Sequence, residues 1–159
     1  MVLLRHNIVM IGYDISRILS LQSAVYRNFI GLFHLNELPE KIGCHNFAVI
    51  NYSNHWFVIH HNLFDEIEVF NSLGENSSVT SKVKSHFKNA KGFVTNNTQL
   101  QSDDCTLCAQ FSIFFIVERY YNPDVSFLQF LNEHFSSNQK RNQQRVEKFV
   151  KRLENGRRF

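Results

Sequence analysis

The chain has 159 residues, of which 43% are hydrophobic and 14% aromatic, with sixteen Phe. This length and composition exclude general disorder and fit one domain, residues 1–159, with a Phe-rich core. No apolar run is long enough to span a bilayer, and Arg5, His6 and Asn7 interrupt the apolar N-terminus. We therefore expect no membrane association and no secretory signal peptide. Three cysteines without framework spacing favour a reducing, intracellular compartment.

The charge is unevenly distributed. Residues 139–159 contain eight basic and two acidic residues, a net charge of +6, whereas residues 1–138 contain nine basic and twelve acidic residues, a net charge of −3. A basic block of this kind can bind nucleic acid or another polyanion, and it is also typical of the solvated face of a terminal helix.

In the first half of the chain, apolar residues at roughly helical spacing predict an amphipathic helix over 16–30, ended by Gly31. Residues 47–52, 56–60 and 67–70 follow as short β-type segments. Asn/Ser and Asn/Asp turns join them, which predicts an antiparallel meander.

In the second half, the pattern predicts a short helix near 79–87, a strand over 91–95 and a buried central helix over 107–121. Two further helices are expected over 127–135 and 142–153, the second amphipathic. The order of these elements predicts an α+β fold, with a central, mostly antiparallel sheet flanked by helices.

Cys108 is the candidate nucleophile, because it begins the apolar helix and unpaired N–H groups at a helix start favour a thiolate. Asp103 and Asp104 precede it as candidate capping residues, and their charge disfavours a thiolate at Cys105. A buried structural role is the alternative for either cysteine. The C-x-x-C spacing lacks a thioredoxin-type context, and Cys44-His45 is the only cysteine-containing partner pair for zinc, so we expect no metal and no cofactor.

Three further residues fit the same chemistry. His55 opens a strand and Asn71 closes the next one, so an antiparallel pairing brings both to the same end of the sheet. There the Asn71 carbonyl can accept a hydrogen bond from the imidazole Nδ1–H and fix its tautomer. Gln101, in a polar loop seven positions before Cys108, can donate an amide N–H to a developing oxyanion. Locally, Asn71 is equally typical of a turn.

These residues resemble the adenovirus-type cysteine proteases (the adenain family), including the proteases of Maverick/Polinton elements and other large DNA viruses. SUMO- and ubiquitin-like-protein proteases are more distant relatives. The resemblance runs from about residue 26 to 153 and rests on His55-Trp56, the segment Glu68–Gly74, Gln101 and the run Cys108–Phe115. Residues 29–33, followed by Leu38-Pro39, resemble the opening helix of the family and the segment in which the chain leaves that helix.

The resemblance implies a papain-related fold and a metal-independent cysteine endopeptidase of viral or virus-derived origin, acting on precursor proteins in a virion, nucleus or cytoplasm. By this correspondence His55 is the base, Asn71 the third member, Gln101 the oxyanion donor and Cys108 the nucleophile. An isopeptidase for a ubiquitin-like modifier and a non-catalytic descendant are the alternatives. The family is also helped by DNA and a short activating peptide, and the basic tail is compatible with DNA binding.

The chain departs from the family pattern at two positions. Asn71 replaces the usual Asp or Glu, and an amide cannot stabilise an imidazolium electrostatically. Ala109 replaces the usual Gly after the nucleophile, where a methyl group would crowd the site or be strained at positive φ. A second register makes Cys105 the nucleophile and Gln99 the oxyanion donor. We prefer Cys108, because only that register places Phe111 and Phe115 on the apolar positions of the family.

Overall fold

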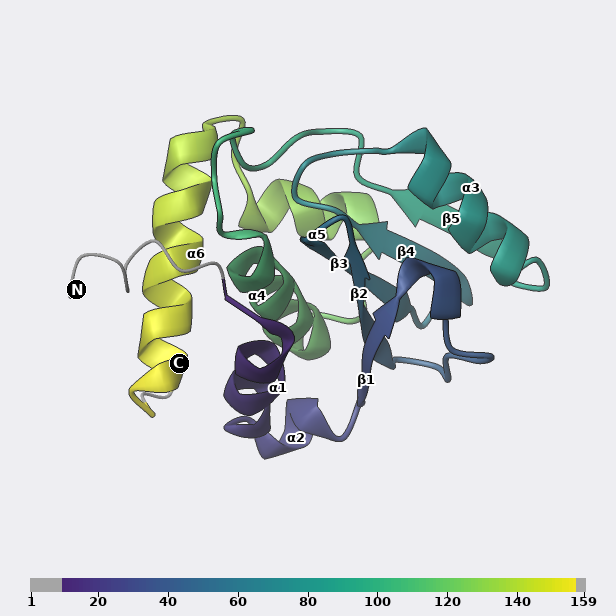
Figure 1. Ribbon diagram of the computed structural model, residues 1–159, viewed down its shortest axis with the longest axis horizontal. Helices are drawn as coiled ribbons and strands as arrows, with labels where there is room; N and C mark the ends of the chain where they lie inside the picture. Colours follow the sequence, from purple (N-terminus) through teal and green to yellow (C-terminus); the bar gives the residue numbers. More distant parts are fainter. Residues whose placement is uncertain (1–9, 157–159) are drawn as a thin grey trace.

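The computed structural model describes residues 10–156 and has a five-stranded sheet with helices on both faces (Figure 1). The α+β prediction is confirmed. The interrupted apolar N-terminus, Arg157 and Arg158 lie outside the described residues. None of the helices within 10–156 is both long and apolar enough to cross a membrane.

The sheet follows chain order from one edge to the other. Its strands are β1 (Phe29–His34), β2 (Phe47–Tyr52), β3 (His55–His61), β4 (Glu66–Phe70) and β5 (Gly92–Thr95). The predicted antiparallel meander is the centre of the sheet, because β3 pairs antiparallel with both β2 and β4. The outer strands pair in parallel, β1 with β2 and β5 with β4.

The helices form two unequal layers. Their bounds are α1 (Gly12–Ser20), α2 (Ser23–Tyr26), α3 (Ser77–His86), α4 (Cys108–Tyr121), α5 (Phe127–His134) and α6 (Gln139–Glu154), with a 3₁₀ turn, η2, at Leu35–Glu37. In Figure 1, α1, α4 and α6 lie on one side of the sheet and α3 on the other. The four helices predicted in the second half of the chain and the strand near 91–95 are all present.

The prediction of one helix over 16–30 is wrong. The chain forms α1 and α2 with a break at Leu21 and Gln22, and Phe29 and Ile30 already belong to β1. Strand β1 alternates partly buried and exposed residues and continues through Gly31, whose φ is 134°. The family-like segment 29–33 is therefore an edge strand and not the end of a helix.

Side-chain alternation along the strands builds two cores. On β2, Phe47 and Val49 face the larger helical layer, whereas Ala48 and Ile50 face α3 and η2. The larger core is rich in Phe, as predicted. Its central helix, α4, contributes Phe111, Phe114 and Phe115 among other buried residues.

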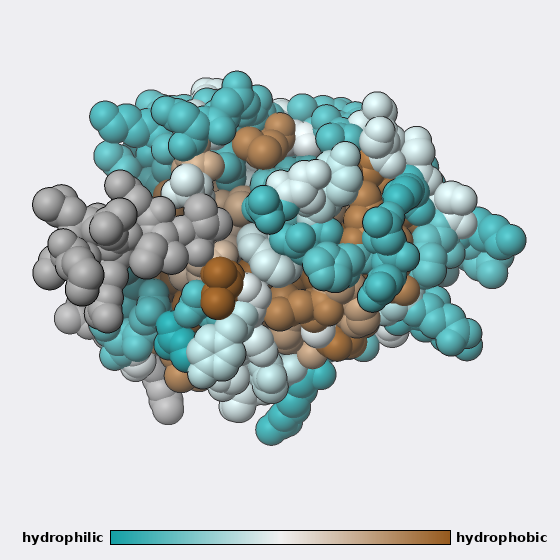
Figure 2. All heavy atoms as spheres, in the orientation of Figure 1, coloured by the Kyte–Doolittle hydropathy of each residue, from teal (hydrophilic) through white to brown (hydrophobic). Residues whose placement is uncertain are grey.

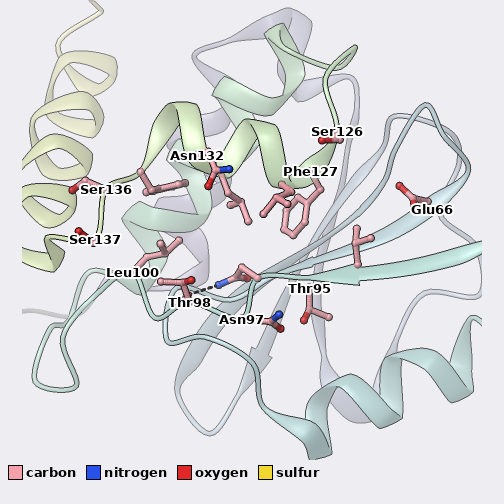
Figure 3. Close-up of a pocket in the computed structure, with 15 residues that line it drawn as sticks. Glu66, Thr95, Asn97, Thr98, Leu100, Ser126, Phe127, Asn132, Ser136 and Ser137 are labelled. Atoms are coloured by element: carbon pink, nitrogen blue, oxygen red, sulfur yellow. Dashed lines mark hydrogen bonds between the residues drawn. The ribbon is translucent and has the colours of Figure 1, made fainter.

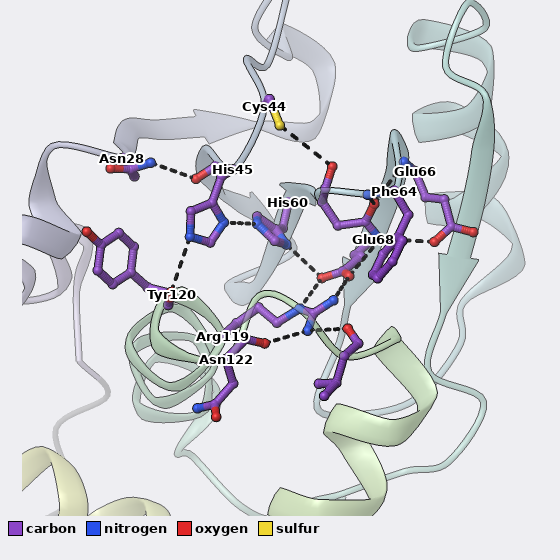
Figure 4. Close-up of polar contacts among 12 residues, drawn as sticks. Asn28, Cys44, His45, His60, Phe64, Glu66, Glu68, Arg119, Tyr120 and Asn122 are labelled. Carbon is purple, nitrogen blue, oxygen red and sulfur yellow. Dashed lines mark hydrogen bonds and ion pairs between the residues drawn. The ribbon is translucent and has the colours of Figure 1, made fainter.

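A charged cluster of His60, Glu68 and Arg119 lies inside this larger core (Figure 4). His60 is near the end of β3, whereas His55 is its first residue. Arg119 of α4 donates to both oxygens of Glu68, from Nε at 3.1 Å and from Nη2 at 2.6 Å. The Nδ1 atom of His60 lies 2.7 Å from Oε1 of Glu68, and all three side chains are fully buried. Burial of these groups is tolerated because each charge is paired and hydrogen-bonded. The same bonds join β3 and β4 to α4.

The surface is mixed in polarity. Figure 2 shows hydrophobic residues gathered mainly in the middle of one face, with hydrophilic residues along the top and at the right of the view. Exposed apolar side chains include Ile30 and Leu32 of the edge strand β1.

Candidate active site

A tight hairpin turn places His55. Tyr52 pairs with His55 across the β2–β3 hairpin, and the two residues between them, Ser53 and Asn54, have φ values of 47° and 61°. Positive φ at both central positions is the type I′ geometry that suits the twist of antiparallel strands. His55 is therefore held, partly buried, as the first residue of β3.

Asn71 follows β4 directly and contacts His55, as predicted. The Nε2 atom of His55 lies 2.7 Å from Oδ1 of Asn71, and Oδ1 also accepts from the backbone N–H of Leu73 at 3.0 Å. The Leu73 donor fixes the oxygen end of the amide, so the histidine nitrogen facing it carries the proton. The predicted contact through Nδ1 is wrong, because the ring presents Nε2 to Asn71 and keeps Nδ1 as the unprotonated nitrogen of its neutral form.

The backbone of Asn71 is clamped by Asn96, a residue that the sequence did not single out. Asn96 accepts from the Asn71 N–H at 2.9 Å and donates to its carbonyl at 2.6 Å. Asn96 is 2% exposed. Both bonds are made by the Asn96 side-chain amide, just beyond the last β4–β5 pair, Val69 and Thr95. The third member of the site is thus fixed by both its main chain and its side chain.

Cys108 is the first residue of α4 and lies against the strand that carries His55. Cys108 is 6% exposed, and the backbone N–H groups of Trp56, Ala109 and Cys108 itself act to lower the pKa of its thiol. Since Trp56 directly follows His55 and α4 packs on β3, the helix start lies near the beginning of that strand. Within residues 10–156, no hydrogen bond joins the Cys108 thiol to the His55 ring.

Burial decides the resting protonation of both groups. Burial raises the pKa of the Cys108 thiol above its ordinary value, although the three N–H groups act in the opposite direction as predicted. Burial also lowers the pKa of His55, and the hydrogen bond to Asn71 opposes that shift without reversing it. Both shifts favour the neutral forms, so the resting pair is a thiol and a neutral imidazole.

Two expectations about the surroundings of Cys108 are wrong. Asp103 and Asp104 do not cap α4, because they bond to Gln99 and Ser102 and the N-cap position is Leu107. Ala109 is not strained, because it lies within α4 and is absent from the positive-φ residues of the described chain. A methyl group is therefore compatible with the backbone after the nucleophile.

Gln101 is buried, at 1% exposure, in the loop before α4. Its Nε2 donates to the Cys105 carbonyl at 3.0 Å, and its Oε1 lies 2.5 Å from the Ser72 hydroxyl. A carbonyl can only accept, so Nε2 is the nitrogen and the Ser72 hydroxyl is the donor to Oε1. One of the two Nε2 hydrogens remains available for another acceptor.

The contacts favour Cys108 over the alternative register. Gln99 uses its Nε2 for the Gln101 carbonyl at 2.9 Å and the Asp103 carboxylate at 2.7 Å, which occupies both amide hydrogens. Cys105 precedes the helix, and burial together with the nearby Cys108, Asp104 and Glu147 groups raises its pKa. Cys105 therefore lacks both the helix amides and a free Gln donor.

A cavity of about 600 Å³ lies beside this arrangement, between the end of β5, the loop that follows it and α5 (Figure 3). Asn96 lines the cavity, whereas His55, Gln101 and Cys108 do not. Within residues 10–156, no three His, Cys, Asp or Glu side chains are grouped to hold a metal ion.

The sequence matches no protein-family model, and a search of the curated proteins found no match either. The solved structures to which this chain is similar include ChlaDub1 and a de-sumoylating protease. ChlaDub1 from Chlamydia trachomatis shares 13% identity with a TM-score of 0.47, over 91% of this chain and 78% of that one. The de-sumoylating protease shares 17% identity with a TM-score of 0.39, over 70% of this chain and 51% of that one. At these values neither a family nor an activity follows for this chain, and the adenain-like assignment stays a prediction.

Proposed function

We propose that the chain is a cysteine peptidase with Cys108 as nucleophile and His55 as general base. The observation that carries this proposal is the placement of Cys108 as the first residue of α4, which packs on β3, the strand that begins with a histidine oriented by Asn71. A thiol, an oriented imidazole and a helix N-terminus are the parts that acyl transfer requires. All three cysteines are free, as a thiol enzyme in a reducing compartment requires.

The proposed reaction starts from the neutral pair. The Cys108 proton moves to Nδ1 of His55 as sulfur attacks the scissile carbonyl, which requires a rotation of side chains from their resting contacts. The free N–H of Gln101 and the N–H of Cys108 stabilise the oxyanion. The imidazolium then protonates the leaving amine, and a thioester forms. Water, deprotonated by His55, releases the carboxylic acid and restores the thiol.

Turnover of defined reporters tests the proposal. We expect cleavage within a peptide library for an endopeptidase, or hydrolysis of aminomethylcoumarin conjugates of ubiquitin or SUMO for a deconjugase. Activity should be lost in Cys108→Ala and kept in Cys44→Ala, since Cys44 is an exposed thiol remote from β3's first residue. A folded wild-type protein that cleaves none of these reporters would identify a non-catalytic descendant and refute the peptidase.

We favour the endopeptidase of viral or virus-derived origin over the deconjugase on the resemblance of the site residues alone. The whole chain, residues 1–159, is proposed to act as one peptidase unit on a protein or peptide substrate. The activating peptide implied by the resemblance stays a prediction.

DNA is the proposed partner of the basic tail. Arg141, Arg145, Lys148 and Arg152 are exposed on α6 at spacings of four, three and four residues, which places them on one stripe of the helix. Binding to a fluorescent duplex should weaken steeply as salt rises, because bound counterions are released. Lys148→Glu together with Arg152→Glu should reduce both the affinity and the salt slope. If the protein does not bind the duplex, or if its affinity for the duplex does not change with salt, the DNA-binding proposal is wrong.

A further inference from the structure

The orientation of the Gln101 amide depends on two partners, the Cys105 carbonyl and the Ser72 hydroxyl. The Ser72 hydroxyl donates to Oε1 of Gln101 at 2.5 Å, and both side chains are buried, at 2% and 1% exposure. An amide can rotate by half a turn with little change of shape, so its two ends are distinguished only by their hydrogen-bond partners. Here the Cys105 carbonyl selects the nitrogen end, and the Ser72 hydroxyl serves the oxygen end.

The main chain holds Ser72 in place for this contact. The Ser72 carbonyl accepts from the N–H groups of Leu100, at 2.8 Å, and Gln101, at 3.1 Å. The preceding residue, Asn71, is clamped by Asn96. The segment after β4 and the loop before α4 are therefore joined by backbone bonds, and the Ser72 hydroxyl approaches Gln101 from a fixed position.

We infer that Ser72 is the positioning residue of the Gln101 amide: together with the Cys105 carbonyl it holds the amide plane in place and leaves one Nε2 hydrogen free for the oxyanion. This inference rests on the proposed peptidase function. Without the hydroxyl, Oε1 of Gln101 is a buried acceptor without a donor, and the Cys105 carbonyl alone holds the amide. The amide can then turn toward another donor, and Nε2 no longer points at the developing oxyanion.

The main test is a double-mutant cycle on kcat, using the coumarin conjugate that the wild-type protein hydrolyses fastest. Loss of one oxyanion donor lowers kcat by roughly 10²–10³-fold, and a donor that is present but misoriented should cost less, about tenfold. We expect Ser72→Ala to lower kcat about tenfold with KM unchanged, and Ser72→Thr to restore it. In a Gln101→Ala background Ser72→Ala should have no further effect, because the hydroxyl acts only through the amide.

The matched control is Ser81→Ala, which removes an exposed hydroxyl from α3. Additive effects of Ser72→Ala and Gln101→Ala, or wild-type kcat in Ser72→Ala, would overturn the inference while leaving the peptidase intact. A wild-type protein that turns over none of the reporters would instead refute the proposed peptidase function.

A second measurement needs no activity. The side-chain amide protons of Gln101 should give one slowly exchanging pair of NMR resonances in the wild-type protein. That pair should broaden or shift in Ser72→Ala and return in Ser72→Thr. Unchanged Gln101 resonances in Ser72→Ala would overturn the inference whether or not the protein turns over a substrate.

Discussion

Two histidines of β3 each make a hydrogen bond of the same length to a residue in or just after β4, yet the surroundings of the two bonds differ. His55 meets the Asn71 amide at 2.7 Å at the end of the strand, and His60 meets the Glu68 carboxylate at 2.7 Å inside the core. Glu68 is accompanied by Arg119, which neutralises it. The pKa of His55 responds to burial and to Asn71, with no charged side chain among the causes within residues 10–156.

The difference shows what a carboxylate requires in this fold. A buried carboxylate is stable beside His60 because Arg119 pairs with it through two hydrogen bonds. An amide at position 71 orients a histidine without needing such a partner. The amide leaves the imidazolium form of His55 without electrostatic stabilisation. We therefore assign chemistry to the His55–Asn71 pair and stability to the His60–Glu68 pair.

The largest expected effect separates the two histidines by activity. His55→Ala should lower kcat by roughly 10²–10⁴-fold, the usual contribution of a general base. Its folding stability should change little, because His55 is only partly buried at a strand end. Steady-state kinetics on the best reporter checks this result, with exposed His34→Ala as the control. Turnover of His55→Ala within a few-fold of wild type would remove His55 from the mechanism.

The free energy of unfolding should change most when the His60–Glu68 pair is mutated. Glu68→Gln leaves Arg119 buried without its counter-charge, which should lower the free energy of unfolding by about 3–5 kcal/mol. Urea unfolding measures this loss. The exposed Glu75→Gln should change it by less than about 0.5 kcal/mol. Equal stability of the two variants would contradict a structural role for the charged cluster.

Asn71→Asp makes the His55 pair resemble the His60–Glu68 pair, because it places a carboxylate beside the imidazole. A carboxylate beside the imidazole should raise the pKa of His55 and favour a thiolate–imidazolium pair at Cys108. The rate of Cys108 alkylation by iodoacetamide at pH 7 should rise about tenfold. Proton NMR of the His55 ring and the alkylation rate measure the two effects, with Asn97→Asp as an exposed control. A slower reaction, in a folded protein, would show that His55 does not act on this thiol.

The smallest effect is a gradual loss of stability in acid. Burial lowers the pKa of His60 from its ordinary value of 6.5, so the unfolded chain binds more protons as pH falls below that value. Burial raises the pKa of Glu68, but the hydrogen bonds from His60 and Arg119 and the Arg119 charge outweigh it and hold the pKa below the ordinary 4.5. The His60 shift costs stability as the pH falls below 6.5, whereas the Glu68 shift stabilises the fold above pH 4.5 and this contribution is lost at lower pH, so both effects make stability decline on acidification.

Urea unfolding from pH 7.5 to 4 should show this decline, and His60→Gln should flatten the part between about pH 6.5 and 5. A stability that rises on acidification would contradict the directions assigned to both groups.

Much of this arrangement follows from sequence patterns, because period and turn residues act locally. Strands β3 and β4 lie on either side of the turn at Asn62–Glu66. Their antiparallel pairing suffices to bring His55 and Asn71 to one end of the sheet. The side of the ring that faces Asn71 depends on a rotamer, which no pattern encodes. The edge strand β1 was hidden because its first apolar residues also fit helical spacing.

The contacts that fix the site cross between segments far apart in the sequence. Asn96 and Ser72 reach Asn71 and Gln101 only after β4, β5 and the loop before α4 are assembled. The charged cluster did leave a signal. Glu68 and Arg119 interrupt otherwise apolar segments with opposite charges, and such residues are seldom buried unless they are paired.

The most direct test of the central claim is covalent labelling of the resting protein by an electrophilic peptide or ubiquitin-like probe, read by intact mass and peptide mapping. We predict one adduct on Cys108, which forms in the wild-type protein and in Cys105→Ala, is absent in Cys108→Ala and is largely lost in His55→Ala. Labelling that survives in Cys108→Ala but disappears in Cys105→Ala would contradict it.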